Sequence, residues 1–421
     1  MHESLVIEEN DKVETVKKHI KIILSFGLIS VFTACGLLKP SKTQQSSIAQ
    51  VEKQAGKFKV LGTKGSGEPP IYGYQDYEAN TVGSIRNALQ QLDGVEVDLQ
   101  MSSDGSFWLF EDHQLKDCRS LSKNFAAIND VELNLASRCW HKNQLVPLDT
   151  MISQLKGQLT SEKTVSFDLR FLNNNVAVEA LGRKKEATKA VINKFREYLK
   201  GQQFSVILQV GNDSIYPLLK KESDYPVYHH QTNDKKFDEK GSFIYSIEIL
   251  KNSSNKKNKS KDYHISEVNT PEDAFYAIEK GASYIQTPDV VLGAFLKKIN
   301  KGSLKDSLLF GTTAEHVDEN KEKLLLATVE LKDLDNNFLL NFQLDSTSAE
   351  RGIFLIYSGE NISGDELTWD GRAVASDVSY WQLMDIEVLK EKGVESIKVY
   401  LSNQNKLNFQ IKNMKLKILT Y

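Results

Sequence analysis

The sequence lacks several features that would assign it to a specialised class of protein. Its 421 residues carry a formal net charge of only −3, although 26% of them are charged. Charges of mixed sign and a small net charge give no global field that favours nucleic acid. The apolar run Ile22–Ala34 is too short to span a bilayer comfortably. The chain is long enough for two globular domains after an N-terminal signal.

The N-terminus has the pattern of an export signal. A basic patch at Lys17–Lys21 precedes the apolar run, which ends in Thr33-Ala34-Cys35-Gly36. Small residues before a cysteine resemble the lipobox of bacterial lipoproteins, in which that cysteine is lipidated. We expect residues 1–35 to be a lipoprotein signal peptide and 36–57 a flexible tether. This predicts an exported bacterial lipoprotein that is anchored to the membrane through Cys35 and faces the periplasm or the surface. A short buried helix with a chance cysteine is the alternative.

Only two other cysteines are present, Cys118 and Cys139. Export to an oxidising compartment would permit them to pair. A bridge would close a loop of roughly twenty residues and add about 3 kcal/mol of stability. Two free thiols are the alternative.

Two stretches of alternating apolar and acidic residues stand out. In Val95–Met101 the apolar residues share one face of a strand, and Glu96 and Asp98 lie on the other. Thr164–Phe171 repeats the pattern with Asp168 and Arg170 on the polar face. Such strands suit a (β/α)8 barrel near its catalytic mouth. Three converging carboxylates would bind a hard cation such as Ca²⁺ or Mg²⁺. Half-exposed strands with solvated acids are the alternative.

Predicted strands and helices alternate over residues 58–300, which indicates a parallel sheet closed into a (β/α)8 TIM barrel. Residues 301–421 have strand-like segments, several of them alternating, with glycine turns and almost no helix signal. This pattern predicts a β-sandwich of jelly-roll type. Trp369, Tyr380 and Trp381 are candidates for a sugar-stacking platform, with a place in the sandwich core as the alternative. The strands predicted in this second part are 324–331, 337–344, 352–357, 381–388, 396–401 and 407–419.

Several short blocks follow one another in a fixed order over residues 58–300. The blocks are Leu61-Gly62-Thr63-Lys64-Gly65, Ala79-Asn80-Thr81, Glu96-Val97-Asp98, Ser103-Asp104-Gly105, Glu111-Asp112-His113-Gln114-Leu115, Pro147-Leu148, Asp168-Leu169-Arg170, Val268-Asn269 and Gly281–Thr287. Together they resemble the glycerophosphodiester phosphodiesterase family, whose members are TIM barrels. Their order and spacing, rather than any single block, carry the resemblance.

The resemblance implies a divalent cation held by Glu96, Asp98 and Asp168, with Lys64 and Arg170 near the phosphate. Family members use two histidines as general base and acid, and here those positions hold Thr63 and Glu111. Threonine does not exchange a proton near neutral pH.

Glu111 is therefore one candidate acid/base group. His113 is a second candidate, because side chains two residues apart in an extended strand point to the same side, and His113 would therefore face the same way as Glu111.

Three functions follow as hypotheses. The first is a metal-dependent phosphoric diester hydrolase acting on glycerophosphodiesters or related phospholipid fragments. The second is a catalytically inactive barrel that still binds an ion and a small phosphodiester, with the sandwich binding a glycan or a protein partner. The third is glycan binding by the sandwich alone, with a purely structural barrel. Turnover that depends on a divalent ion separates the first from the others.

Overall fold

The protein is described from a computed structural model. The described residues are 54, 56–66, 77–116, 122–137, 145–173, 184–232, 241–252, 262–301, 305–317, 322–334, 337–344, 346–347, 353–373, 378–403 and 409–420. Cys35, Cys118 and Cys139 lie outside these ranges, so the predicted lipidation and disulfide stay predictions. Within the described ranges, no helix is both long enough and apolar enough to cross a membrane.

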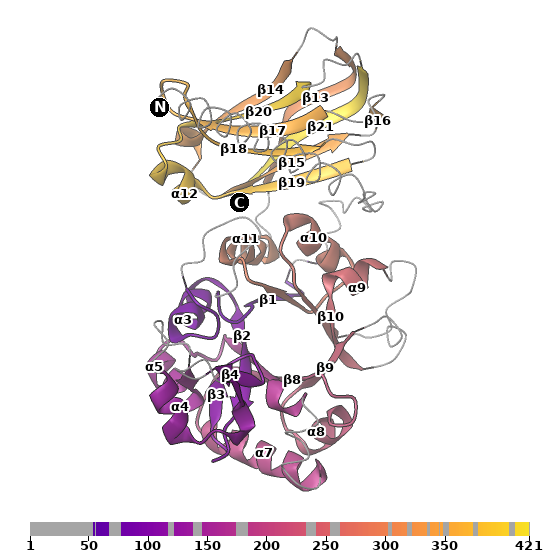
Figure 1. Cartoon of the computed structure of the whole chain (residues 1–421). Helices are drawn as coiled ribbons and strands as arrows, with labels where there is room; N and C mark the ends of the chain where they lie inside the picture. The colour runs from indigo at the N-terminus through magenta and orange to yellow at the C-terminus, as the bar shows by residue number, and fades with distance from the viewer. Residues whose placement is uncertain are drawn as a thin grey trace, which may run out of the picture. The chain divides into compact units, whose positions relative to one another are not determined.

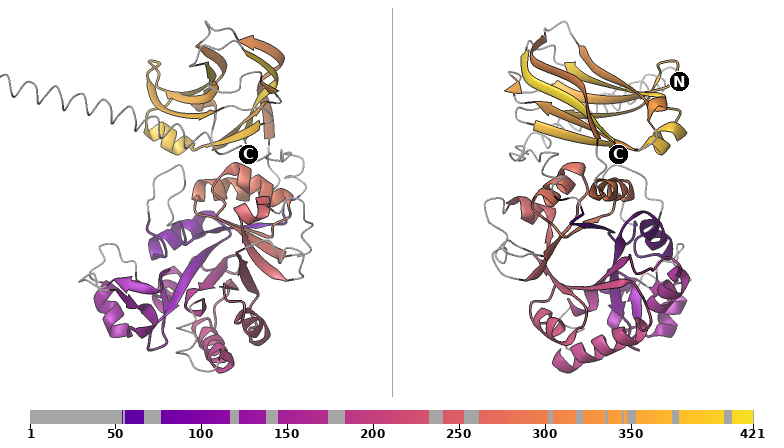
Figure 2. Two further views of the ribbon diagram at one scale, coloured as in Figure 1. Left: turned by 45° about the vertical axis from the view of Figure 1, so that its right-hand side comes forward. Right: turned by 180° about the vertical axis from the view of Figure 1, so that it is seen from behind.

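The first part of the chain folds into a closed barrel of eight parallel strands (Figures 1 and 2). Neighbouring strands pair in the order β1-β12-β11-β10-β9-β8-β7-β2, and β1 pairs with β2 to close the ring. This confirms the predicted TIM barrel. The strands are β1 Lys59–Gly62, β2 Gly94–Met101, β7 Thr164–Leu169, β8 Ser205–Val210, β9 Val227–Gln231, β10 Ser242–Ser246, β11 Asp262–Ser266 and β12 Tyr284–Thr287.

Helices cover the outside of the barrel, where the apolar faces of the strands point. Val95, Val97 and Leu99 of β2 are all 0% exposed and belong to one large core cluster with the helices. Burial of this alternating apolar face is the main force that fixes the register of each strand. The helices of this part are α3 Val82–Gln91, α4 Asp130–Ser137, α5 Leu148–Leu155, α7 Lys184–Tyr198, α8 Tyr216–Glu222, α9 Ile247–Asn252, α10 Pro271–Glu279 and α11 Val290–Asn300.

A small antiparallel extension leaves the barrel after β2. In it, β3 (Phe107–Leu109) pairs antiparallel with β2 on one side and with β6 (Val146–Pro147) on the other. The segment between them contains β4 (Gln114–Lys116), β5 (Ser122–Asn124) and the 3₁₀ turn Phe125–Ala127. It places Glu111 and His113 directly after β3.

The second part forms two antiparallel sheets that share a separate hydrophobic core, as expected for a β-sandwich. One sheet has the order β13-β21-β15-β19, with β16 on β21, and the other the order β14-β20-β17-β18. The elements are β13 Lys305–Val317, β14 Lys323–Glu330, β15 Phe338–Leu344, β16 Ser346–Thr347, β17 Ile353–Glu360, β18 Glu366–Ala373, β19 Val378–Met384, α12 Ile386–Glu391, β20 Ser396–Asn403 and β21 Phe409–Thr420, with a 3₁₀ turn at Leu331–Asp333.

Two expectations for this part were wrong. The strand predicted at 381–388 is the end of β19 followed by α12, because Asp385 caps the helix by accepting bonds from the amides of Glu387 and Val388. The predicted aromatic platform does not exist as a unit. Trp369 is 64% exposed on β18, whereas Trp381 is 4% exposed on β19 of the other sheet.

Candidate functional site

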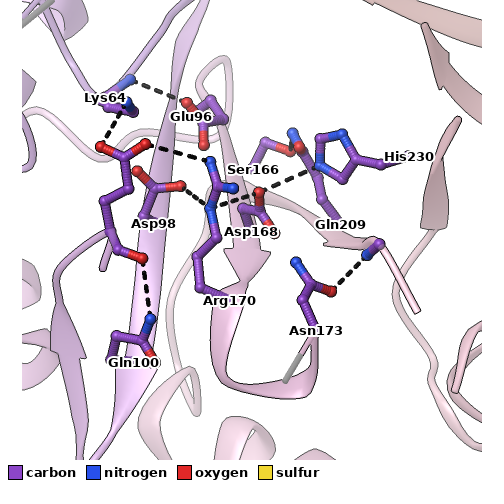
Figure 3. Close-up of polar contacts among 12 residues, drawn as sticks. Lys64, Glu96, Asp98, Gln100, Ser166, Asp168, Arg170, Asn173, Gln209 and His230 are labelled. Carbon is purple, nitrogen blue, oxygen red and sulfur yellow. Dashed lines mark hydrogen bonds and ion pairs between the residues drawn. The ribbon is translucent and has the colours of Figure 1, made fainter. Parts of the chain in front are cut away.

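Three acidic side chains from two neighbouring strands meet inside the barrel (Figure 3). Glu96 and Asp98 are on β2 and Asp168 is on β7, and the parallel register pairs Asp98 with Asp168. They are only 4%, 0% and 1% exposed, and one oxygen from each lies within 4.8 Å of the other two. The alternative of half-exposed, solvated acids is therefore wrong. The sequence-predicted ligands do converge.

The loop after β1 presents Lys64 to this cluster in a strained conformation. Its φ of 50° lies in the left-handed region, which is uncommon for a residue with a side chain. The Glu96 carboxylate holds it there by accepting the Lys64 backbone N–H at 3.0 Å, while the Lys64 carbonyl accepts from Ser84 and Asn80. Strain of this kind persists only where the surroundings over-determine it, often at functional sites.

Asn80 fixes Asp98 with two hydrogen bonds. Its Nδ2 donates to Asp98 Oδ2 at 3.0 Å, and its Oδ1 accepts the Asp98 backbone N–H at 2.9 Å. Asn80 also has a positive φ, 57°. The block Ala79-Asn80-Thr81 is part of the family resemblance, but the sequence predicts no role for Asn80 in the site; its positioning of Asp98 is visible only in the structure.

Arg170 brings a positive charge into contact with two of the three carboxylates. It sits in a 3₁₀ turn, Arg170–Leu172, after β7 rather than on the predicted longer strand. Its Nε is 2.6 Å from Asp98 Oδ1 and 3.0 Å from Asp168 Oδ2. Burial acts to lower the pKa of Arg170, but Asp168 and Asp98 outweigh it and raise the pKa above its usual value. The guanidinium therefore stays charged in the site.

Glu111 lies against both basic side chains. Its Oε2 is 2.8 Å from Lys64 Nζ and its Oε1 is 4.0 Å from Arg170 Nη2. Its side chain is 46% exposed, far more than those of the three buried acids. His113 instead places its Nδ1 3.4 Å from Gln100 Nε2. Of the two candidate acid/base groups, Glu111 is the one that contacts the basic side chains of Lys64 and Arg170.

A histidine that the sequence did not predict for the site lies beside Asp168. His230 on β9 places its Nε2 3.2 Å from Asp168 Oδ2 (Figure 3). The Tyr228–Gln231 stretch has no acidic alternation of the kind that singled out β2 and β7. Only the strand order, which separates β9 from β7 by β8 alone, predicts this proximity.

The electrostatics of the cluster fit a divalent cation. Burial raises the pKa of Glu96 well above its ordinary value, and the neighbouring Asp98 and Asp168 raise it further. Burial also raises the pKa of Asp98, although Arg170 opposes it. Asp168 Oδ1 has no well-aligned hydrogen bond among the described residues. An ion bound here would neutralise crowded negative charge and satisfy that oxygen.

The raised pKa of Glu96 predicts a pH-dependent gain in stability for Glu96→Gln. A carboxyl whose pKa is higher in the folded state stabilises the fold below its unfolded pKa, near 4.5, and loses that contribution as pH rises through the folded pKa. In chelator at pH 8 we expect the variant to be more stable by roughly 1–3 kcal/mol, the usual cost of a poorly satisfied buried group.

Urea unfolding of both proteins at pH 8 and pH 4 measures this difference. At pH 4 the gain should vanish, because Glu96 is protonated in the folded wild type. A variant that is less stable than the wild type at pH 8 would contradict the assigned direction.

Comparison with known proteins gives a family-model match that lies within the barrel. Residues 73–271 match the model of the glycerophosphoryl diester phosphodiesterase family. No curated protein matches the chain.

The solved structures that this chain matches include three phosphodiesterases. A putative glycerophosphoryl diester phosphodiesterase from Agrobacterium tumefaciens str. C58 is 12% identical, with 58% of this chain and 99% of that chain covered and a TM-score of 0.44. A phosphodiesterase from Oleispira antarctica in complex with its product sn-glycerol-3-phosphate is 15% identical, with 58% and 96% covered and a TM-score of 0.42. The glycerophosphodiester phosphodiesterase from Thermotoga maritima is 17% identical, with 57% and 98% covered and a TM-score of 0.38.

Proposed function

Because residues 73–271 match the model of the glycerophosphoryl diester phosphodiesterase family, we propose that this chain is a metal-dependent phosphoric diester hydrolase. Its substrates are glycerophosphodiesters or related phospholipid fragments. The observation that carries the proposal is the buried trio Glu96, Asp98 and Asp168, with Lys64 and Arg170 beside it. Asp168 lies near the carboxyl end of β7, and Lys64 and Arg170 lie just after the ends of β1 and β7, the side of the barrel where TIM-barrel enzymes have their active sites.

Each group has a task in this proposal. The three carboxylates hold a divalent cation, Ca²⁺ or Mg²⁺ in the simplest case, which would offset charge on the phosphoryl oxygens. Lys64 and Arg170 bind the remaining phosphoryl oxygens through charge-assisted hydrogen bonds. Asn80 keeps Asp98 in place through its paired hydrogen bonds.

Proton transfer falls to Glu111 in this proposal. Thr63 occupies the position of one family histidine and has no group that titrates near neutral pH. Glu111 occupies the other, touches Lys64, and is exposed enough to swing away as substrate enters. From there its carboxyl group exchanges a proton with the leaving alcohol.

A second candidate function is an inactive barrel that binds a small phosphodiester without turnover. Two observations favour it. Thr63 removes one proton-transfer group, and Glu111 already pairs with the two cations that a phosphate needs. In this version the ion and phosphate ester still bind, and the pocket serves recognition.

One assay separates the two functions. Full-length protein is incubated with glycerophosphocholine, glycerophosphoethanolamine and glycerophosphoglycerol, with Ca²⁺, with Mg²⁺ and with chelator, and release of the alcohol is measured. The hydrolase predicts release that requires an ion. Binding of glycerol phosphate with no release above the chelator control would establish the inactive barrel and reject the hydrolase.

We also propose that the chain is an exported lipoprotein anchored through Cys35, on the strength of its N-terminal sequence pattern. Radiolabelled palmitate should be incorporated into the wild type in a bacterial host and not into Cys35→Ser. Equal incorporation in the two proteins would reject the anchor. A glycan or protein partner for the β-sandwich stays a prediction that rests on the exposed Trp369.

A further inference from the structure

The backbone of Glu111 is tied to β2, the strand that carries two of the buried acids. Phe110, the residue before it, donates its backbone N–H to the Asp98 carbonyl at 3.1 Å. Gln100 Nε2 donates to the Glu111 carbonyl at 3.0 Å, and Gln100 is only 2% exposed. The segment after β3 therefore stays beside the site unless these bonds break, and only the side chain of Glu111 has room to move.

The Glu111 side chain is placed to change its partners when a phosphate binds. It is 46% exposed, whereas the side chain of Lys64 is 10% exposed. Within the described part of the chain, Glu111 forms ion pairs with Lys64 at 2.8 Å and Arg170 at 4.0 Å, and with no other basic side chain. The proposed function gives both of these basic groups to the phosphoryl oxygens. Phosphate binding therefore takes both partners from Glu111 and leaves its carboxylate beside a second anion.

The charges of the site leave no surplus positive charge for a further anion. Its carboxylates balance the two basic side chains and one divalent ion taken together. They are Glu96, Asp98, Asp168 and Glu111. A phosphate ester of a neutral alcohol adds negative charge without compensation, which costs free energy in a partly buried site. An ester whose alcohol carries an ammonium group brings one compensating positive charge close to its phosphate.

We propose that Glu111 binds the ammonium group of an amino alcohol in the substrate, so that the site prefers phosphate esters of ethanolamine or choline to those of neutral alcohols. The phosphate replaces Glu111 on the two basic side chains, and the ammonium replaces those side chains on Glu111. A histidine at this position, as in the family that the sequence resembles, would lack the negative charge that makes this exchange. The inference rests on the proposed function, because it names the class of alcohol bound at the same site.

Phosphoethanolamine and hydroxyethyl phosphate provide the test, because they differ only in an ammonium group in place of a hydroxyl. Both are monoesters, so a diester hydrolase does not turn them over during titration calorimetry with the full-length protein at fixed Mg²⁺. We expect the wild type to bind phosphoethanolamine about five- to tenfold more tightly, the range of one partly exposed charge pair. Glu111→Gln and Glu111→Ala should lose this preference. Asp112→Asn, which removes the same charge from the next, exposed residue, should keep it.

The outcomes separate this inference from the proposed function. Equal or weaker binding of phosphoethanolamine by the wild type overturns the preference and leaves the phosphate site standing, and this comparison needs no variant. A preference that persists in the Glu111 variants, checked for folding by circular dichroism, assigns the ammonium to another group and overturns the role of Glu111. Binding of neither ester to the wild type overturns the phosphate site itself, and with it the proposed hydrolase.

Discussion

Asp98→Asn is expected to lower ion-dependent turnover roughly 100- to 1,000-fold, the loss typical of removing a main electrostatic group of an active site. Asp98 is 0% exposed and contacts Arg170 as well as Asn80. The amide keeps the volume and one acceptor oxygen, so the fold should survive while one ionic ligand is lost. Isothermal titration should show the affinity for the divalent ion falling about 100-fold.

Asp93→Asn is the matched control, because Asp93 immediately precedes the first residue of the strand that carries Asp98. Its Oδ2 accepts the Val60 N–H at 3.0 Å, a bond that an asparagine oxygen also makes. Turnover and ion binding should be unchanged there. Undiminished ion-dependent turnover in Asp98→Asn would show that the chemistry occurs elsewhere.

Glu111→Gln is expected to raise the affinity for inorganic phosphate about tenfold or more. In the present structure the Glu111 carboxylate lies 2.8 Å from Lys64 and 4.0 Å from Arg170, the two groups assigned to the phosphate. An incoming anion must displace the Glu111 carboxylate and is repelled by its negative charge. A charge-assisted hydrogen bond is worth about 1.5–3 kcal/mol, and about 1.4 kcal/mol corresponds to a factor of ten.

Titration calorimetry with phosphate at fixed Mg²⁺ measures this change. Glu132→Gln serves as control, since Glu132 pairs with Lys123 at 3.7 Å between two half-exposed side chains and should not alter phosphate binding. An unchanged or weaker phosphate affinity in Glu111→Gln would mean that Lys64 and Arg170 do not form the anion site. Turnover should fall in the same variant if Glu111 transfers the proton.

The sequence predicted most of the barrel because its strands obey one strong rule. Val95, Val97 and Leu99 alternate with Glu96 and Asp98, so burial of one face fixes the inward direction of the other. Prediction was weaker where local chemistry overrides alternation. Asp385 caps α12 within a stretch that alternates like a strand, and Arg170 reaches the site from a 3₁₀ turn.

Only part of the candidate site could be predicted from the sequence. Acidic residues that alternate with apolar ones in two predicted strands form a pattern that is visible in the sequence. This pattern predicted Glu96, Asp98 and Asp168. His230 left none, because its place beside Asp168 follows from the closure of the sheet and the order of β7, β8 and β9. The contact between Glu111 and Lys64 likewise needs the path of the chain after β3.

Anomalous X-ray diffraction from crystals of the protein soaked with Mn²⁺ and glycerol 3-phosphate tests the central claim most directly. The account predicts one strong manganese peak among Glu96, Asp98 and Asp168, with a phosphate group between that ion and the side chains of Lys64 and Arg170. Glu111 should be turned away from both cations. A manganese peak elsewhere, or Arg170 and Glu111 in their present contacts with no ion in the cluster, would contradict the assignment of this cluster as a metal and phosphate site.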